Sequence, residues 1–249
     1  MDKFNFAVNL VREAQLIIKD KKDKFTYHKK TNNSDLVTDV DILVEDFISR
    51  KIKERYNKDS ILGEERNKSF NEDSFNQWIL DPIDGTLNFI HQGENFAISL
   101  AYYEKKKPIF GIVLDVISDD LYYAIKGEGA FYNDNKLEIQ TSKPLVDSIV
   151  ITSHRWIMDG CLEKFLDKIK SVRHLRYYGV ASLEICYIAR GLADLYISAK
   201  LFPWDYAAAM IIAKEVGLVA KNFKNKNLDG FIESEVVITS EEIYEEVFN

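Results

Sequence analysis

An apolar run that ends in two closely spaced aspartates constrains this chain more than any other feature. Residues 78–80 read W-I-L and are followed by D-P-I-D-G-T. A short apolar run that stops at turn-forming residues favours a buried strand. Pro82 has no N–H with which to extend a β ladder, so we expect the chain to leave the sheet after Asp81. Asp81 and Asp84 are three residues apart across the resulting turn, and their carboxylates can point to the same place.

Composition places the chain among ordinary globular proteins. Its 249 residues are 46% hydrophobic, and 11 glycines and 4 prolines are too few for a collagen-like or low-complexity chain. The longest apolar run, residues 206–213, is far shorter than the roughly 20 residues of a membrane helix. The first residues, M-D-K-F-N, contain no apolar signal segment, so we expect a cytoplasmic protein. A net charge of -7 argues against a nucleic-acid surface, and we expect neither nucleic acid nor membrane as a partner.

The two cysteines, Cys161 and Cys186, are too few for a disulfide framework in a chain of this size. They are also too far apart for a C-x-x-C metal or redox pair. Both lie in apolar, helix-like surroundings, and a free cysteine packs as a small hydrophobic residue. We expect both to be reduced and packed.

Hydrophobic periodicity changes at residues 141–144. Before that point two amphipathic helices precede a run of strands, and after it strands and helices alternate. We expect one lobe over residues 1–140, a second over 141–249, and one compact unit with the site between them. Strands interleaved with helices indicate layers, in an α+β or α/β class. The predicted helices cover 4–20, 40–56, 162–169, 181–190, 205–216 and a short C-terminal segment, and the predicted strands cover 60–62, 78–80, 96–103, 109–116, 121–125, 130–132, 148–152, 193–198 and 236–240.

Acidic residues recur where a predicted strand stops or a predicted helix begins. Carboxylate oxygens from three or more such segments form the kind of hard anionic ligand set that Mg²⁺ prefers. Bound metal ions would let an acidic protein hold an anionic substrate. The residues concerned are Asp39, Asp41, Glu64, Glu65, Asp81, Asp84 and Asp205.

Each of these positions also has an ordinary structural explanation. Asp84 followed by glycine is a common hairpin turn. Asp205 stands where it could cap a helix, and Glu64 could lie in an exposed loop. Thr38 and Asp41 have the spacing of a capping pair. The prediction of a metal site therefore depends on the whole set of carboxylates rather than on any one of them.

Six motifs follow one another along the chain. They are D-L-V-T at 35–38 with Asp41, G-E-E at 63–65, W-I-L-D-P-I-D-G-T-L-N-F at 78–89, G-E-G-A at 127–130, G-V-A-S-L-E at 179–184 and P-W-D-Y-A-A at 203–208. In order and spacing they resemble the inositol monophosphatase family of Mg²⁺-dependent, lithium-sensitive phosphatases. The resemblance implies the layered α-β-α-β-α sandwich shared with fructose-1,6-bisphosphatase. It also implies a small phosphorylated metabolite as substrate and a homodimer.

The resemblance implies two to three Mg²⁺ ions. Glu64, Asp81 and the Ile83 carbonyl would bind one ion, and Asp81, Asp84 and Asp205 would bind a second. Glu64 would hold a third, weaker ion together with waters. Two such ions roughly 3.5–4 Å apart can neutralise a phosphate, activate a water and stabilise the leaving oxygen. The implied reaction is Mg²⁺-dependent hydrolysis of a small phosphomonoester by an activated water.

The resemblance also implies roles for the residues around the metals. Asp41 and Thr86 would hold and deprotonate the attacking water, with Glu65 beside the ligands to order water or accept a proton. Gly85 and Thr86 would open a helix whose N–H groups face the phosphate. The remaining positions expected to contact phosphate or substrate are Lys30, Ala181 and Ser198.

Ser198 departs from the family pattern. Inositol-binding members carry a glutamate there, and a serine hydroxyl reaches less far and accepts hydrogen bonds less strongly. The resemblance therefore supports the reaction class more firmly than the substrate. Inositol monophosphate, NADP, fructose 1,6-bisphosphate and 3′-phosphoadenosine 5′-phosphate all stay open. A regulatory binding protein of the transcription machinery is the alternative of a different class.

Overall fold

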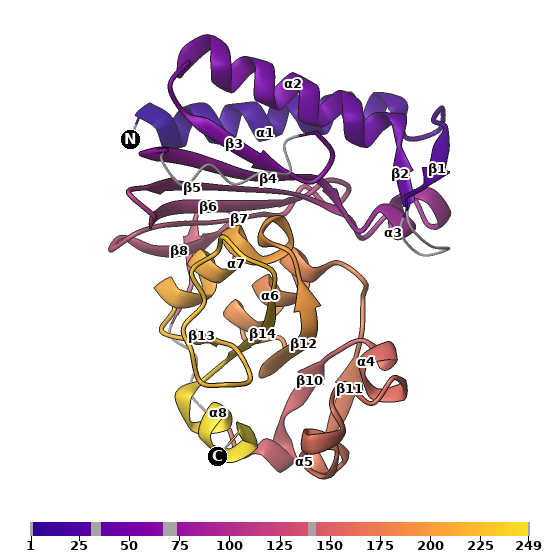
Figure 1. The fold of residues 1–249 in the computed structure, drawn as a ribbon, viewed down its shortest axis with the longest axis vertical. Coiled ribbons are helices and arrows are strands. Elements are labelled where there is room, and N and C mark those ends of the chain that lie inside the picture. The colour runs from indigo at the N-terminus through magenta and orange to yellow at the C-terminus, as the bar shows by residue number, and fades with distance from the viewer. Residues whose placement is uncertain (1, 31–35, 67–73, 139–142, 249) are drawn as a thin grey trace.

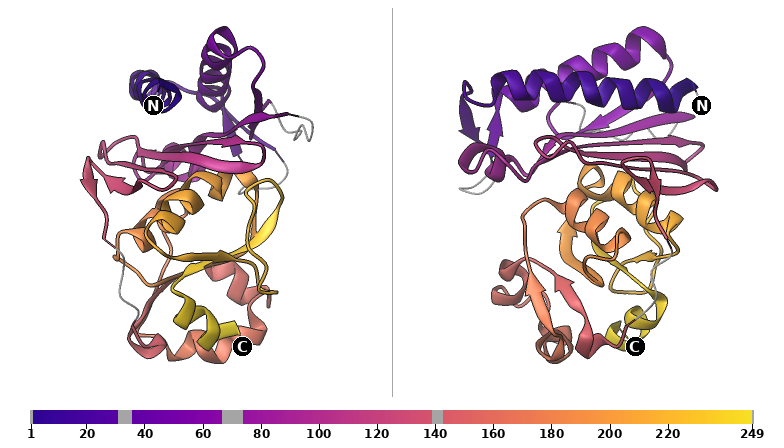
Figure 2. Two further views of the ribbon diagram at one scale, coloured as in Figure 1. Left: turned by 90° about the vertical axis from the view of Figure 1, so that its left-hand side faces the viewer. Right: turned by 180° about the vertical axis from the view of Figure 1, so that it is seen from behind.

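Helices and sheets alternate through the molecule in five layers (Figure 1). The computed structural model describes residues 2–30, 36–66, 74–138 and 143–248. Two views from other sides show the same succession of layers (Figure 2). The expected α-β-α-β-α sandwich is therefore confirmed. The helices of the first layer are α1 (Asp2–Lys21) and α2 (Asp39–Arg55), those of the middle layer are α6 (Ala181–Ala189) and α7 (Pro203–Glu215), and those of the last are α5 (Leu166–Ser171) and α8 (Glu241–Phe248).

The sheet beneath α1 and α2 has seven strands in chain order. Its first two strands are parallel and the other pairs are antiparallel. The four predicted strands between residues 96 and 132 are confirmed. The strands are β3 (Ser60–Gly63), β4 (Asn76–Asp84), β5 (Ala97–Glu104), β6 (Lys107–Asp115), β7 (Leu121–Ile125), β8 (Gly129–Tyr132) and β9 (Asn135–Lys136).

The prediction that the chain leaves the sheet after Asp81 is wrong. Strand β4 continues to Asp84, which pairs with Ala97, while Asp81 pairs with Ser99. Between these two pairs β4 advances by three residues while β5 advances by two, so β4 contains one extra residue. This irregularity accommodates Pro82 within the strand. The same irregularity brings both aspartates to the end of the sheet.

The second sheet mixes parallel and antiparallel pairs in the order β11-β10-β12-β14-β13. The predicted strands at 148–152, 193–198 and 236–240 are confirmed as β10, β12 and β14. The predicted helix at 162–169 is instead a 3-10 turn, η2 (Glu163–Phe165), followed by α5. The strands are β10 (Ile149–Ile151), β11 (His174–Arg176), β12 (Leu195–Leu201), β13 (Val219–Lys221) and β14 (Ser234–Thr239).

Several short elements were not predicted from the sequence. Strands β1 (Tyr27–Lys29) and β2 (Leu36–Thr38) form a small antiparallel pair, and β11 and β13 also have three residues each. Three residues are too few to display a period. Helices α4 (His154–Met158) and η1 (Leu145–Asp147) were not predicted either, whereas α3 (Thr86–His91) begins where the helix opened by Gly85 and Thr86 was expected.

Three apolar cores fill the spaces between the layers. Trp78 and Leu80 of β4 join the core under α1 and α2, whereas Ile79 joins the core around α6 and α7. The third core includes Ile169 and Ile243, from α5 and α8. The seven-stranded sheet is therefore buried on both faces, which explains why residues 78–80 are continuously apolar instead of alternating.

The two cysteines differ in burial. Cys186 is buried in the core around α6 and α7, as expected. Cys161 is exposed, so the prediction that both cysteines are packed is wrong for this residue. It lies in the turn between α4 and η2, and turns run over the protein surface.

Strands β3–β9 precede the predicted boundary at residues 141–144, and β10–β14 follow it. Part of that boundary lies outside the described residues. Within the described ranges, no helix is long and apolar enough to cross a membrane.

Candidate active site

Carboxylates from three elements converge where the layers meet. Strands β3 and β4 are parallel, with Gly63 paired to Leu80, so Glu64 and Asp81 follow at the same edge of the sheet. Asp205 reaches this edge from the first turn of α7. Glu64, Asp81 and Asp205 each offer an oxygen atom, and these atoms all lie within 4.8 Å of one another. The set provides hard anionic oxygens at the spacing of a metal site.

Backbone N–H groups orient the three aspartates. Asp81 accepts a hydrogen bond from the Ile83 N–H at 3.0 Å, and Asp205 accepts one from the Phe202 N–H at 2.8 Å. Asp84 accepts one from the Ser182 N–H at 2.7 Å, in the first turn of α6. Asp205 thus caps the start of helix α7 and belongs to the carboxylate cluster at the same time. The carboxylates are thus fixed by the folded backbone before any ligand binds.

The carboxylates make one another harder to ionise. Burial raises the pKa of Asp81 and that of Asp205 well above their usual range, and the charge of Glu64 raises both further. Burial also raises the pKa of Asp84 to about 6, although the hydrogen bonds from Ser182 oppose this. A bound cation would remove this mutual repulsion.

Asp41 and Thr86 meet beside the cluster. Thr86 Oγ1 lies 3.2 Å from Asp41 Oδ1 and 3.1 Å from the Ile83 carbonyl oxygen, and either oxygen can accept its proton. The other oxygen of Asp41 accepts from the Thr38 N–H at 2.9 Å and from the Thr38 hydroxyl. Burial raises the pKa of Asp41 to about 6 against these hydrogen bonds. The predicted capping pair therefore forms, and it also aims Asp41 at Thr86.

The other predicted residues near Asp41 and Thr86 in the sequence differ in their positions relative to the cluster. Asp39 is exposed and accepts a hydrogen bond from the Thr26 N–H, away from the cluster. Asp35, part of the first motif, lies outside the described residues. Gly85 has a left-handed φ of 92°, and a Cβ there would lie 2.7 Å from Val180 Cγ2, so the turn before α3 requires glycine. The predicted helix start at Gly85 and Thr86 is confirmed by α3.

Lys30 extends to the acidic pair after β3. Its Nζ lies 2.7 Å from Glu64 Oε1 and also contacts Glu65. Burial raises the pKa of Glu65 to about 7, with the charge of Glu64 adding to the shift and Lys30 opposing it. Burial alone would lower the pKa of Lys30, but the charges and hydrogen bonds of the two glutamates outweigh burial and raise it.

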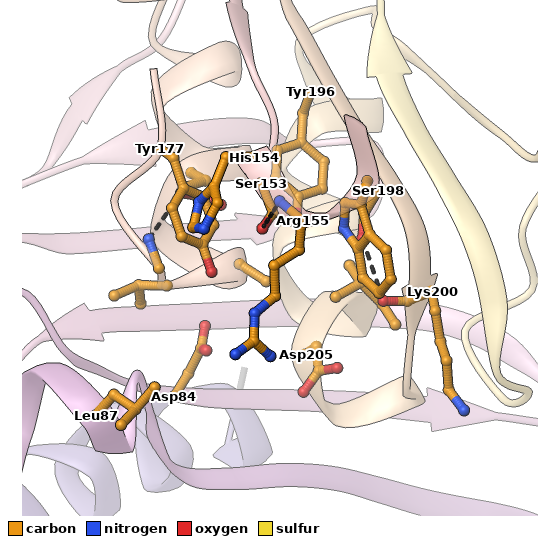
Figure 3. A pocket seen from close by; sticks show the side chains of 16 residues that line it. Asp84, Leu87, Ser153, His154, Arg155, Tyr177, Tyr196, Ser198, Lys200 and Asp205 are labelled. Carbon is orange, nitrogen blue, oxygen red and sulfur yellow. Dashed lines mark hydrogen bonds between the residues drawn. The ribbon is translucent and has the colours of Figure 1, made fainter. Parts of the chain in front are cut away.

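A cavity of about 470 Å³ opens over the carboxylates. Asp84 and Asp205, expected as metal ligands, line it together with Ser198 (Figure 3), and so does Ala181. Lys30, Gly85 and Thr86, which were also expected to contact phosphate or substrate, are not among the residues that line it. The Ser198 hydroxyl donates to the Lys200 carbonyl oxygen at 3.1 Å, so its proton is already engaged within the chain.

Several residues that line the cavity were not identified from the sequence. Figure 3 shows the Arg155 side chain extending toward the part of the cavity that Asp84 and Asp205 line. Arg155 belongs to the polar segment S-H-R that follows strand β10. The acidic residues were found because they stand where a strand ends. The same criterion, applied to polar residues of any kind, would have identified this segment. The other lining residues that were missed are Leu87, Ser153, His154, Trp156, Tyr177, Gly179, Val180, Glu184, Tyr196, Lys200 and Leu201.

Comparison with known proteins gives a consistent result. Residues 2–248 match the model of the inositol monophosphatase family. The inositol-1-monophosphatase of Bacillus subtilis (strain 168) is 36% identical over 219 residues, which cover 85% of this chain and 82% of the relative.

Solved structures agree in both fold and sequence. SaIMPase-II with bound inositol monophosphate is 35% identical, with a TM-score of 0.90 over 100% of this chain and 94% of that chain. It has also been solved with bound 2'AMP. An IMPase/NADP phosphatase complexed with Mg²⁺ and phosphate is 27% identical, with a TM-score of 0.92 over 99% of this chain and 94% of that chain. The expected family is thereby confirmed, and the chain belongs to the inositol monophosphatase family of phosphomonoester hydrolases.

Proposed function

We propose that this chain hydrolyses small phosphomonoesters with Mg²⁺ as cofactor. The observation that carries the proposal is the cluster of Glu64, Asp81 and Asp205, whose oxygen atoms lie within 4.8 Å of one another. These hard, anionic and mutually repelling groups fit Mg²⁺, which prefers oxygen ligands. The complex of an IMPase/NADP phosphatase with Mg²⁺ and phosphate supports the same cofactor.

The proposed ligands are the residues assigned by the family resemblance. Glu64, Asp81 and the Ile83 carbonyl would hold one ion, and Asp81, Asp84 and Asp205 a second, with Glu64 available to a third. When bound, Mg²⁺ supplies Lewis-acid chemistry that neutralises the phosphate and acidifies water. The backbone N–H groups that orient the three aspartates support this arrangement, since preorganised ligands need little rearrangement.

The chain's own residues would handle the proton of the attacking water. In the proposed step, Thr86 Oγ1 accepts a proton from the water while its own proton passes to Asp41 Oδ1. The 3.2 Å contact between these atoms supports the relay. Glu65 would order the surrounding water, and Lys30 would stabilise Glu64 and Glu65 through the contacts described above.

We infer broad substrate specificity from the wall around Ser198. Its hydroxyl proton is engaged with the Lys200 carbonyl. Ser198 is therefore a weaker hydrogen-bond partner for a hydroxyl group of the substrate than a glutamate would be. Gly85, Thr86 and Ala181 would contact the phosphate end, which is common to all candidate substrates. The SaIMPase-II complexes with inositol monophosphate and with 2'AMP fit a site of this kind.

Phosphate release from the purified protein tests the proposed function. The substrates are inositol 1-phosphate, NADP, fructose 1,6-bisphosphate and 3′-phosphoadenosine 5′-phosphate, each with Mg²⁺ and with a chelator. We expect Mg²⁺-dependent release from several of them, with kcat/KM values within about one to two decades. Release that persists in chelator would contradict the cofactor, and a preference above about a thousandfold for one substrate would contradict broad specificity. The homodimer and the cytoplasmic location stay predictions.

A further inference from the structure

Two buried glutamates outside the proposed ligand set hold the segments that flank the cavity. Glu45 of α2 is 0% exposed and accepts hydrogen bonds from the Glu65 N–H at 2.7 Å and the Arg66 N–H at 2.9 Å. Glu184 of α6 is 2% exposed and accepts from the Tyr178 N–H at 2.5 Å and the Gly179 N–H at 2.9 Å. Each carboxylate therefore binds two consecutive backbone N–H groups of a neighbouring segment. Hydrogen bonds to a charged acceptor are stronger than those between neutral groups.

Glu45 fixes the segment that carries Glu64. It binds the N–H groups just after Glu64 and also packs against the residue before it, because a Cβ on Gly63 would lie 2.5 Å from Glu45 Oε1. Asp41 lies one turn earlier on the same helix and contacts Thr86. Helix α2 thus sets the position of one proposed metal ligand through a side chain that does not itself belong to the ligand set.

Glu184 fixes the segment that forms one wall of the cavity. Tyr177, Gly179 and Val180 of this segment all line the cavity. On its other side the segment is held by Asn88, whose Nδ2 donates to the Tyr178 carbonyl oxygen at 2.8 Å. The Glu184 carboxylate therefore fixes the wall against helix α3, which begins at Thr86.

We infer that Glu45 and Glu184 are positioning residues with separate tasks. Glu45 places the Glu64 segment and so sets the affinity for the divalent cation. Glu184 places the 177–180 wall and so sets recognition of the alcohol part of the substrate. The inference rests on the proposed function, because it assigns each residue to a different half of that reaction.

The test compares Glu45→Gln and Glu184→Gln with a matched control. Glu45 holds its two N–H groups with different oxygens, so the NH₂ group of Glu45→Gln would face one of them. Glu184 holds both N–H groups with one oxygen, so Glu184→Gln keeps that acceptor and removes the charge that strengthens both bonds. Asp59→Asn is the control, because Asp59 is 3% exposed and accepts from Lys3, Asn76 and Trp78 at the opposite end of β3. For each protein, calorimetry gives the Mg²⁺ dissociation constant, and phosphate release at saturating Mg²⁺ gives KM for inositol 1-phosphate.

We expect the two variants to shift different constants. Glu45→Gln should weaken Mg²⁺ binding by about tenfold and leave KM within about twofold. Glu184→Gln should raise KM by about tenfold and leave Mg²⁺ binding within about twofold. Asp59→Asn should lower the melting temperature without moving either constant. The inference is overturned if both variants shift the same constant, if neither shifts one, or if the control shifts them equally.

Hydrogen exchange provides a readout that does not need turnover. Amide exchange should accelerate at Glu65 and Arg66 only in Glu45→Gln, and at Tyr178 and Gly179 only in Glu184→Gln. If a glutamine variant does not fold, Glu45→Asp and Glu184→Asp can replace it. They retain the charge but shorten the side chain by one methylene group, and each should accelerate exchange only at its own segment. Absence of phosphate release from the unmodified protein would refute the proposed function. If amide exchange accelerated equally at both segments in both variants, the separate positioning roles of Glu45 and Glu184 would be refuted.

Discussion

The metal-ligand half and the substrate half of the cavity are built differently. The carboxylates lie at the ends of β3 and β4 and in the first turns of α2 and α7, and Asp41 and Asp81 are almost completely buried. The opposite wall comes from strand β12 and from the segments that follow β10 and β11, and its Arg155 and Tyr177 are exposed. Backbone geometry thus fixes the groups that would act on phosphate, whereas the wall that would meet the rest of the substrate combines exposed side chains with buried ones such as Ser198. We infer that such a wall can change with the substrate while the groups that act on phosphate stay the same.

Removing a proposed ligand should have the largest effect. We expect Asp81→Asn to lower kcat/KM by more than about a thousandfold, because it removes a charge worth several kcal/mol to the bound cations. It should also abolish the rise in melting temperature on addition of Mg²⁺. Asp39→Asn is the matched control, since Asp39 is exposed and lies away from the cluster. Normal Mg²⁺-dependent turnover by Asp81→Asn would show that the metal half is wrongly assigned.

The proton relay should account for the next largest effect. Thr86→Ala removes the hydroxyl that contacts Asp41 and leaves every proposed carboxylate ligand in place. We expect kcat to fall by between about 10²- and 10⁴-fold, as for loss of a general-base step, with little change in KM. Steady-state kinetics at saturating Mg²⁺ separates the two constants. A raised KM with an unchanged kcat would mean that Thr86 only binds phosphate.

The metal half should also make the metal-free protein sensitive to pH. Burial raises the pKa of Asp41 and that of Asp84 to about 6 in the folded chain, above the value near 4 expected when unfolded. The stability contributed by their bound protons is therefore present below about pH 4 and lost as the pH rises through about 6. Calorimetry without metal should show Tm falling by roughly 5 °C between pH 5 and pH 8.

Saturating Mg²⁺ should reverse that fall at pH 8, since a bound cation replaces the protons. The control is the Tm of Asp39→Asn over the same range, which should follow the unmodified protein. A metal-free Tm that stays constant or rises with pH would contradict the raised pKa values of Asp41 and Asp84.

The smallest effect should come from the substrate half. Ser198→Glu introduces the acceptor that the family resemblance leads us to expect at this position, and it should shift the ratio of kcat/KM values toward inositol 1-phosphate over NADP by about tenfold. Ser198→Ala is the control, because it removes the hydroxyl and adds no acceptor. An unchanged ratio in Ser198→Glu would mean that other residues of the wall recognise the alcohol.

The two halves also differ in how well they could be predicted. The proposed ligand residues lie at the end of a strand, just after one, or in the first turn of a helix, and these positions can be located from local patterns such as W-I-L-D-P-I-D-G-T. The irregularity in β4 could not, because a proline inside a strand depends on how β5 pairs with it. Glu45 and Glu184 were not assigned any role either, since a glutamate on a helix gives no sign of which distant N–H groups it binds. Cys161 was misplaced because its apolar neighbours suggested a helix where the chain forms a turn.

The central claim is that Glu64, Asp81 and Asp205 together hold the catalytic cations. Anomalous diffraction from crystals of this protein soaked with Mn²⁺ and inorganic phosphate tests it most directly, because Mn²⁺ takes the same oxygen ligands as Mg²⁺ and can be located on its own. We predict anomalous peaks within coordination distance of these three carboxylates, with phosphate density beside them. Peaks elsewhere, or none in crystals of a protein that releases phosphate in solution, would contradict the account.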